Sequence, residues 1–415
     1  MTQAVDIAII GGGMVGASLA VALAPLGLKV ALVEAVPHDS QAQPSFDERT
    51  TALSNGSRRI LETLKVWPAV EQRATPIRKI HVSDQGRFGF ARIDAAEQGL
   101  AAMGYVVPNR ALGAALWSMV EASTGIEVHC PATVEGVDAG RAEAAGGTVE
   151  LLIGQGGAPR RIEAKLVVAA DGAHSAVRSA FGVEAQSRDY DQTAVITTVL
   201  PQRFHDHVAY ERFTESGPLA LLPLEQGRCT LVLTLARAAA ESIMAWSETE
   251  FLAEVQNRFG FRLGRFLKAG RRVPYPLALT RALRTSATRC VIVGNAAQSL
   301  HPVAGMGFNL GLRDIATLAE VIAEHAREPG FDAGETGLLE EYDAWRAADR
   351  AGIIAFTDGL VRVFSSPLHT VRRLLDLGLL AFDVFPPAKA ALSRLSTGAG
   401  AGARVPKLAR GVALR

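Results

Sequence analysis

The chain has 415 residues, of which 48% are hydrophobic and 20% charged, an ordinary globular composition. This composition excludes a mainly disordered, collagenous or solenoid chain, and the length predicts two or three domains or one large interrupted domain. The 43 Lys and Arg residues nearly balance the 42 Asp and Glu residues, and the net charge of +1 gives no electrostatic case for nucleic acid as a partner.

The cysteines and the N-terminal segment indicate the cellular compartment in which the protein is expected. Cys130, Cys229 and Cys290 are far apart, which argues against a zinc site or a disulfide framework and is typical of a reducing compartment. The segment MTQAVDIAII lacks the basic region of a secretory signal, and no apolar run approaches the ~18 residues that a spanning helix needs. We therefore expect a cytoplasmic protein that binds no metal.

The first elements expected are a strand, a helix and a second strand. Residues 5–10 (VDIAII) form a short β-branched apolar run, typical of a buried parallel strand. Residues 11–16 (GGGMVG) follow and lead into a helix of small residues, and a second strand at 29–33 (KVALV) ends in Glu34. A GxGxxG turn between strand and helix, with an acid after the second strand, predicts a dinucleotide-binding unit.

Each residue of this pattern has a physical role. Gly11 permits the tight turn, Gly13 lets a pyrophosphate approach the backbone, and Gly16 lets the helix pack close to the strand. The helix N-terminus offers free N–H groups to the phosphates. Glu34 can accept hydrogen bonds from the ribose hydroxyls, and its charge disfavours a 2′-phosphate, which leaves FAD and NAD open.

Two later motifs favour FAD. The apolar strand expected at 166–170 runs into 171–178 (DGAHSAVR), and the strand expected at 290–293 runs into 294–311 (GNAAQSLHPVAGMGFNLG). Both are strand-to-loop-to-helix junctions, where α/β sheets bind ligands. Backbone N–H groups of the glycine-rich end of the second loop can stabilise negative charge on a flavin ring.

With these three motifs in this order, the chain resembles the class A flavoprotein aromatic hydroxylases of the p-hydroxybenzoate hydroxylase-like fold. The resemblance implies an α/β fold in which a Rossmann-like FAD-binding domain is interleaved with a mostly antiparallel substrate domain, followed by C-terminal helices. Carried over by position, it assigns contacts with FAD or its loops to Gly11, Gly13, Gly16, Glu34, Asp171, Gly172, Arg178, Asn295, Gly305, Gly307, Phe308 and Asn309.

The loop of the third motif also carries the residues that the resemblance places at the reacting end of the flavin. Pro302 would direct its carbonyl toward the active site, and His301 is either a second active-site residue or a structural loop histidine. Asn295 stands where the family has aspartate, and Gln298 where it has histidine. Because Asn keeps an acceptor of similar shape, we expect FAD binding to survive.

Further segments resemble the ubiquinone-biosynthesis branch, whose hydroxylases act on a 2-polyprenyl-6-methoxyphenol. They are 47–54 (DERTTALS), 81–84 (HVSD), 211–214 (ERFT) and 217–223 (GPLALLP). The resemblance places Arg49 near the flavin, with a loop salt bridge as the alternative. It places Arg110 near the ribityl chain, with solvation of a helix end as the alternative.

The spacing of the motifs predicts interleaved domains. We expect the FAD-binding domain at 1–75, 106–182 and 280–350, the substrate domain at 76–105 and 183–279, C-terminal helices at 351–395 and a flexible basic tail at 396–415. Alternating segments such as AVITTVL predict a half-buried antiparallel sheet in the substrate domain. The substrate pocket is expected at Phe213, Leu219, Leu221 and Pro223.

The C-terminal helices either cap the core or contact a membrane or partner. The tail from Lys389 onward carries basic residues and no acid, so it is expected to touch anionic lipid. This expectation places the protein in the cytoplasm, peripherally on the inner membrane face.

The resemblance also implies the reaction. Reduced FAD would react with O₂ to a C4a-hydroperoxide that hydroxylates the phenol ring, giving 2-polyprenyl-6-methoxy-1,4-benzoquinol, with NAD(P)H as electron donor and contact with a ubiquinone-biosynthesis complex. Two alternatives stay open. One is a flavin hydroxylase of another aromatic compound, and the other is a non-catalytic flavoprotein subunit of a biosynthetic complex.

Overall fold

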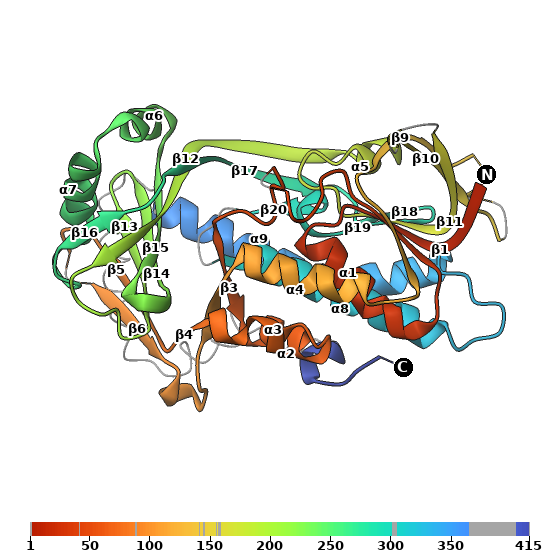
Figure 1. Cartoon of the computed structure of the whole chain (residues 1–415), viewed down its shortest axis with the longest axis horizontal. Coiled ribbons are helices and arrows are strands. Elements are labelled where there is room, and N and C mark those ends of the chain that lie inside the picture. The colour runs from red at the N-terminus through yellow and green to blue at the C-terminus, as the bar shows by residue number, and fades with distance from the viewer. Residues whose placement is uncertain are drawn as a thin grey trace.

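The structure is a computed structural model that describes residues 2–40, 42–87, 89–140, 142–143, 146–154, 156, 159–300, 305–364 and 404–414. Two large sheets lie side by side, and the long strands β12 (Ala185–Pro201) and β17 (Val273–Ala282) run from one to the other (Figure 1). This α/β arrangement confirms the expected fold class.

The first sheet carries the dinucleotide-type strands. Its order is β18-β19-β11-β1-β2-β8, and β19, β11, β1, β2 and β8 are parallel, with β10 and β9 added antiparallel beside β11. The strands are β1 (Thr2–Ile10), β2 (Val30–Val33), β8 (Ile126–His129), β9 (Thr133–Asp138), β10 (Val149–Gly154), β11 (Arg160–Ala169), β18 (Ser286–Ala287) and β19 (Cys290–Ile292). The end of β1 is fully buried, as its β-branched run predicts.

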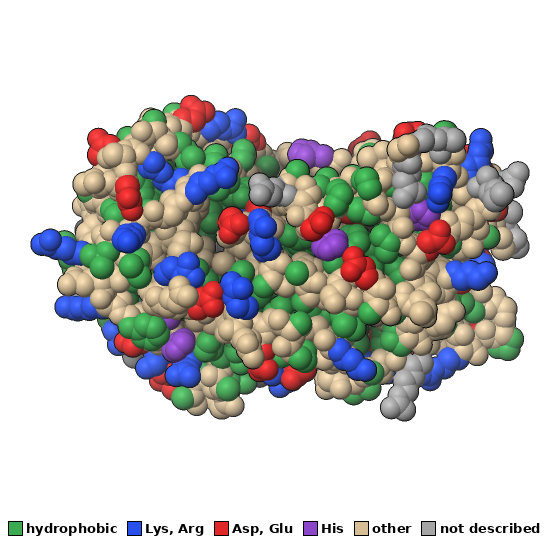
Figure 2. Space-filling view, viewed as in Figure 1, with side chains coloured by type: hydrophobic (Ala, Val, Ile, Leu, Met, Phe, Trp, Pro, Cys, Tyr) green, Lys and Arg blue, Asp and Glu red, His purple; other side chains and the backbone are tan. Residues whose placement is uncertain are grey.

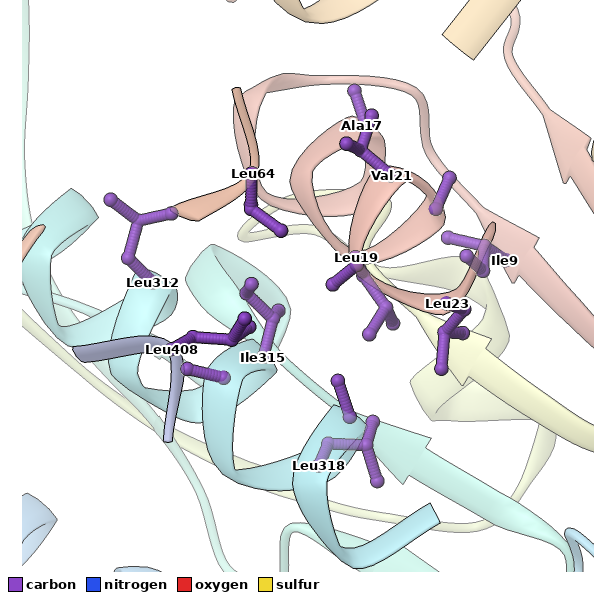
Figure 3. Close-up of a cluster of buried hydrophobic side chains, with 14 of the residues drawn as sticks. Ile9, Ala17, Leu19, Val21, Leu23, Leu64, Leu312, Ile315, Leu318 and Leu408 are labelled. Carbon is purple, nitrogen blue, oxygen red and sulfur yellow. The ribbon is translucent and has the colours of Figure 1, made fainter. Parts of the chain in front are cut away.

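Helices cover one side of this sheet. They are α1 (Met14–Leu23), α4 (Asn109–Glu121), α8 (Met306–His325) and α9 (Thr336–Phe364). Leu19 of α1 and Ile315 of α8 lie in one apolar cluster with Leu408 from the C-terminal segment (Figure 3). This cluster fixes the start of α1, and therefore the glycine loop, relative to the start of α8.

The second sheet is mostly antiparallel. Its order is β20-β17-β12-β15-β14-β13-β5-β6, with β16 beside β12, and only the β13–β5 pair is parallel among the pairings described. The strands not yet given are β5 (Lys79–Asp84), β6 (Phe90–Asp94), β13 (Val208–Thr214), β14 (Gly217–Pro223), β15 (Cys229–Ala236), β16 (Phe266–Ala269) and β20 (Gln298–Ser299). Helices α6 (Arg237–Ala245) and α7 (Glu248–Phe259) pack on one face.

A small sheet, β3-β7-β4, lies between the two large ones. Its strands are β3 (Thr50–Ser54), β4 (Thr75–Ile77) and β7 (Gly104–Pro108). The short helices are α2 (Asn55–Thr63), α3 (Trp67–Val70), α5 (Ala176–Ala180), η1 (Ala24–Leu26), η2 (Glu71–Arg73), η3 (Ala96–Gln98), η4 (Glu225–Gly227), η5 (Gly294–Ala296) and η7 (Leu408–Arg410).

The C-terminal segment corrects one expectation. Residues 404–414 were expected in a flexible tail, but they pack against α2 and α8, and Leu408 and Leu414 are buried. Arg404 and Lys407 pair with Glu320 and Glu324 of α8, so α8 neutralises two of the basic residues that the sequence suggested for lipid, while Arg410 is exposed. The remainder of the expected tail and residues 365–395 of the expected helices lie outside the described residues.

Within the described part of the chain, no helix is both long enough and apolar enough to cross a membrane. Charged side chains of both signs are scattered over the face shown in Figure 2, among apolar and uncharged groups.

Candidate FAD and substrate site

The glycine loop after β1 has the geometry that the motif predicts. Gly11 has a φ of +106°, a left-handed conformation that favours glycine, and a Cβ there would lie 2.4 Å from the Ala170 carbonyl oxygen. A Cβ on Gly16 would lie 1.9 Å from the Gly11 carbonyl oxygen, so α1 packs directly on the turn. A Cβ on Gly13 would meet the Ser45 hydroxyl at 2.8 Å. The backbone at Gly13 is therefore open to a ligand except for one small side chain.

Glu34 closes the far side of this loop. Its carboxylate accepts hydrogen bonds from the Gly12 N–H at 2.5 Å and the Val36 N–H at 2.8 Å, and only 8% of the residue is exposed. The sequence did not single out Trp117 of α4, whose indole N–H donates to the Gly12 carbonyl at 3.0 Å. A lone tryptophan in a helix carries no motif, so sequence reasoning had no signal for it.

The second motif forms a turn beside the glycine loop. Gly172 has a φ of +91°, and one oxygen of Asp171 accepts from the Val177 N–H at 3.2 Å. The other oxygen of Asp171 is buried without a partner among the described residues. Arg178 donates to the carbonyls of Ala173 at 3.2 Å and Ala296 at 2.8 Å, so it joins the second motif to the third.

The start of the third motif is divided between exposed and buried residues. Asn295 is exposed, while the Gln298 amide donates to Asp314 of α8 at 2.9 Å. Asp314 is fully buried, and Arg346 and Arg350 of α9 bind it at 2.7 Å and 3.1 Å. Burial acts to raise the pKa of Asp314, but the two guanidinium groups hold it below its usual value. Both expected catalytic residues, His301 and Pro302, lie outside the described residues.

The glycine-rich end of this loop meets the small sheet. Gly305 has a φ of +59° and a Cβ there would lie 3.2 Å from Ala52 Cβ, whereas Gly307 and Phe308 are partly exposed on the first turn of α8. The Asn309 amide accepts from the Ser54 N–H at 2.8 Å and donates to the Ala52 carbonyl at 2.8 Å. Asn309 thus fixes β3 against the start of α8.

Arg49 lies in a compact group between the two large sheets. It binds Asp47 at 2.6 Å and lies 4.4 Å from the centre of the Tyr275 ring, and the Tyr275 hydroxyl donates to Asp47 at 2.8 Å. Burial acts to raise the pKa of Asp47, but its bonds to Arg49 and Tyr275 hold it below the usual value. Burial and the bond to Asp47 raise the pKa of Tyr275 to about 12. Arg110 is exposed and pairs with Glu48 at 3.1 Å.

The expected substrate residues separate onto two faces of the second sheet. Leu219 and Leu221 pack under α6 and α7 with Phe251 and Val255, away from the small sheet, and alternation puts Pro223 on their face. Phe213 registers with Pro218 on the opposite face, which also carries Ala220 and Leu222. The expectation that Leu219, Leu221 and Pro223 line the substrate pocket is therefore corrected, because helices cover the face that carries them. The open face is the opposite one, which carries Ala220 and Leu222.

The described residues fit FAD. At Gly13 only the Ser45 side chain occupies the space beside the backbone, one oxygen of Asp171 is buried without a described partner, and no described side chain caps the N-termini of α1 and α8. The first turns of these two helices lie together, because a Cβ on Gly311 of α8 would lie 2.9 Å from Val15 of α1. Helix N-termini after the strands of such a sheet are where dinucleotides bind. The described residues hold no cluster of His, Cys, Asp or Glu able to bind a metal ion.

Comparison with known proteins gives the family. The family described as "FAD binding domain" matches residues 4–357. Ubiquinone hydroxylase UbiL of Rhodospirillum rubrum is 36% identical over 411 residues, which is 99% of this chain and 93% of the relative. The 3-demethoxyubiquinol 3-hydroxylase of Escherichia coli is 33% identical over 389 residues, covering 92% of this chain and 95% of the relative.

A solved structure supports the fold alone. The p-nitrophenol 4-monooxygenase PnpA of Pseudomonas putida DLL-E4 superposes with a TM-score of 0.77 at 18% identity, covering 95% of this chain and 99% of that chain. The family model and the two curated relatives show that the chain belongs to the FAD-dependent monooxygenases, in the branch of the ubiquinone hydroxylases, with FAD as cofactor and NAD(P)H as the donor typical of the family.

Proposed function

We propose that this enzyme hydroxylates the ring of a polyprenylated methoxyphenol in ubiquinone biosynthesis, converting 2-polyprenyl-6-methoxyphenol to the 1,4-benzoquinol. The observation that carries the proposal is the apolar face of the second sheet that α6 and α7 leave uncovered. Its Leu222 packs on the small sheet that Asn309 fixes to the start of α8, and its Ala220 and Val232 beside that contact stay partly exposed. An apolar wall beside a flavin loop suits an aromatic ring that carries a prenyl tail.

The residues of the three motifs are assigned to different parts of FAD. We propose that Gly11, Gly13, Gly16 and Glu34 hold the ADP part of FAD, and that Asp171, Gly172 and Asn295 contact its middle, with Arg178 supporting their loops. Arg110, which is exposed beside Glu48, would reach the ribityl chain only after leaving that pair. These assignments rest on the position of each residue in the three motifs.

The remaining residues surround the reacting end. Bound FAD, once reduced, supplies the activation of O₂. We propose that Gly305, Gly307 and Phe308 border the flavin ring, that Asn309 fixes their turn, and that Arg49 is held at the site entrance by Asp47 and Tyr275. The apolar face would exclude water and hold the substrate ring in one orientation, which would protect bound reduced FAD from side reactions.

A second candidate differs in the ring position. The E. coli relative is a 3-demethoxyubiquinol 3-hydroxylase, so hydroxylation of a carbon next to an existing oxygen substituent competes with the para position. Peripheral contact with the membrane and with a biosynthetic complex belongs to either candidate, because the substrate tail is a lipid.

The experiment uses holoenzyme, NAD(P)H and three substrates: 2-prenyl-6-methoxyphenol, the same phenol without its prenyl group, and a short-chain demethoxyubiquinol. NMR spectra of the products give the ring position. The proposal expects the prenylated phenol to yield the 1,4-benzoquinol with the highest kcat/KM. Product only from the demethoxyubiquinol supports the second candidate, and equal use of the unprenylated phenol contradicts a polyprenyl substrate.

A further inference from the structure

The open face of the second sheet has one continuous line of partly exposed side chains. In register across five strands these are Ile196 of β12, Val232 of β15, Ala220 of β14, Glu211 of β13 and Val82 of β5. Residues in register point to the same face of a sheet. Four of the five are apolar, so the line forms an apolar strip with one carboxyl in it, and we call it the Glu211 strip.

The domain that carries the FAD motifs covers both sides of this strip. On one side, the Thr230 hydroxyl lies 2.9 Å from the Thr50 hydroxyl of β3, and Leu222 packs in a cluster with Ala52. On the other side, Tyr275 registers with Ala194 and binds Asp47 at 2.8 Å. The strip itself keeps its partial exposure between these contacts, and Ala52 at its border lies 3.2 Å from the Cβ position of Gly305 at the start of α8.

The Glu211 carboxyl makes no hydrogen bond or ion pair with any described residue. Burial alone raises its pKa to about 7. The other titratable groups that register places on neighbouring positions of this face are already engaged: Asp84 pairs with Arg87 at 3.3 Å, and Tyr275 binds Asp47, which holds Arg49.

An unpaired acid in an apolar strip costs stability, and packing does not account for it. Acids of this kind gather at functional sites, where burial tunes their proton affinity. A hydrophobic residue would serve a purely apolar tail-binding strip better than Glu211 does.

We propose that Glu211 is a catalytic residue that takes the proton from the phenol hydroxyl while the ring lies on the strip. The O–H bond of the phenol breaks, an O–H bond forms on the carboxylate, and the electron pair stays on the phenolate oxygen. Delocalised into the ring, that pair makes the ortho and para carbons more nucleophilic toward the oxygen being transferred. The carboxyl later releases the proton to product or solvent.

The chemistry of the group agrees with this role. A phenol such as tyrosine has a pKa of about 10 and an ordinary glutamate one of about 4.3, which makes glutamate a weak base toward phenol. A base with a pKa near the working pH is more effective. A large fraction of it is unprotonated at that pH, and it binds a proton more tightly than an ordinary carboxylate does. Neutral residues fill the rest of the strip, so Glu211 is its sole proton acceptor among the described residues.

The test compares wild-type holoenzyme with Glu211→Gln, which keeps the shape and removes the proton acceptor. Glu211→Asp restores a carboxylate, and Glu215→Gln, at an exposed position of the same hairpin, is the matched control. The probe is 2-prenyl-6-methoxyphenol. Three quantities are measured: FAD content, the pH profile of kcat/KM for hydroxylation, and the phenolate absorbance of the bound probe in difference spectra that require no turnover.

The proposal rests on the proposed function, and its expected results are specific. Wild-type kcat/KM falls as the pH drops below about 7, because the carboxylate becomes protonated. Glu211→Gln retains FAD, loses about 100-fold in kcat/KM, lacks this acidic limb and binds the probe as neutral phenol. Glu211→Asp regains part of the rate and the limb, and Glu215→Gln behaves as wild type.

Three results would overturn it. Glu211→Gln within about threefold of wild type, with the same acidic limb, would show that another group takes the proton. If that variant loses FAD, a wild-type difference spectrum with no phenolate signal above pH 7 would decide against Glu211. A wild-type enzyme that hydroxylates no phenol removes the proposed function itself, whereas the first two results remove only the role of Glu211.

Discussion

The glycines of the first loop exclude side chains for different reasons. At Gly16 the obstacle is the Gly11 carbonyl, a backbone atom 1.9 Å from the Cβ position, which cannot move without opening the turn. At Gly13 the obstacle is the Ser45 hydroxyl, the end of a small side chain, and φ is an ordinary −63°. Gly16 is therefore required by the fold and Gly13 by the ligand.

This difference predicts that Gly13→Val gives a folded protein without FAD. The valine side chain displaces Ser45 and fills the approach to the pyrophosphate, so flavin absorbance per protein should fall more than tenfold, while the thermal midpoint of the apoprotein stays within about 3 °C. Gly337→Ala, at an exposed helix position with open space around it, is the control and should keep its flavin. A yellow Gly13→Val holoprotein would refute the assignment of this loop.

At the scale of elements, the buried pairing of Asp314 with Arg346 and Arg350 joins α8 to α9. Gln298 extends this network into the third motif. The position of that loop therefore depends on two charged residues far along the chain. Asp314 lies 16 residues after Gln298, and Arg350 lies 52 residues after it. Buried charges of this kind contribute through their partners, so removing one leaves the others uncompensated.

Asp314→Asn should accordingly destabilise the protein by about 3–5 kcal/mol in urea denaturation. The lowered pKa of Asp314 means that its contribution is present above its unfolded value of about 3.9 and is lost as pH falls through the folded value. The free energy of unfolding of the variant should therefore fall less than that of wild type as the pH is lowered into the acidic range. Asp343→Asn, which changes a more exposed acid of the same network, serves as control. Equal stability of Asp314→Asn and wild type at pH 7 would contradict this account.

The C-terminal segment gives a second prediction at this scale. Glu320 is 1% exposed and depends on Arg404 and Lys407 for its counter-charges. The double variant Arg404→Gln, Lys407→Gln should lower the free energy of unfolding by about 2–4 kcal/mol, because the buried Glu320 carboxylate loses both counter-charges and keeps only the backbone N–H of residue 407. Its binding to anionic vesicles should match wild type, since these charges are paired within the protein.

Arg410→Gln removes an exposed basic charge from the same segment and is the matched control for stability. Thermal denaturation and co-sedimentation with anionic liposomes measure the two properties separately. Full stability together with weakened vesicle binding in the double variant would restore the lipid-binding tail that the sequence suggested.

At the scale of the whole molecule, the sequence predicted what local motifs encode. The strand, glycine turn and helix at Gly11 to Gly16 are contiguous, so their geometry follows from neighbouring residues. The apolar residues of 217–223 suggested a wall of the substrate pocket, but the sequence could not tell which face of the sheet α6 and α7 would cover, and Leu219 and Leu221 were therefore placed on the open side. The partners of Arg404 lie about 80 residues earlier, beyond the range of any local pattern.

The central claim is that the FAD site and the open apolar face together perform a monooxygenation of a prenylated phenol. The most direct measurement is mass spectrometry of the product from holoenzyme, 2-prenyl-6-methoxyphenol and NAD(P)H under ¹⁸O₂. The account predicts a 1,4-benzoquinol that carries one labelled oxygen atom in its new hydroxyl group. Rapid NAD(P)H oxidation that yields only hydrogen peroxide, with the phenol recovered unlabelled, would contradict it.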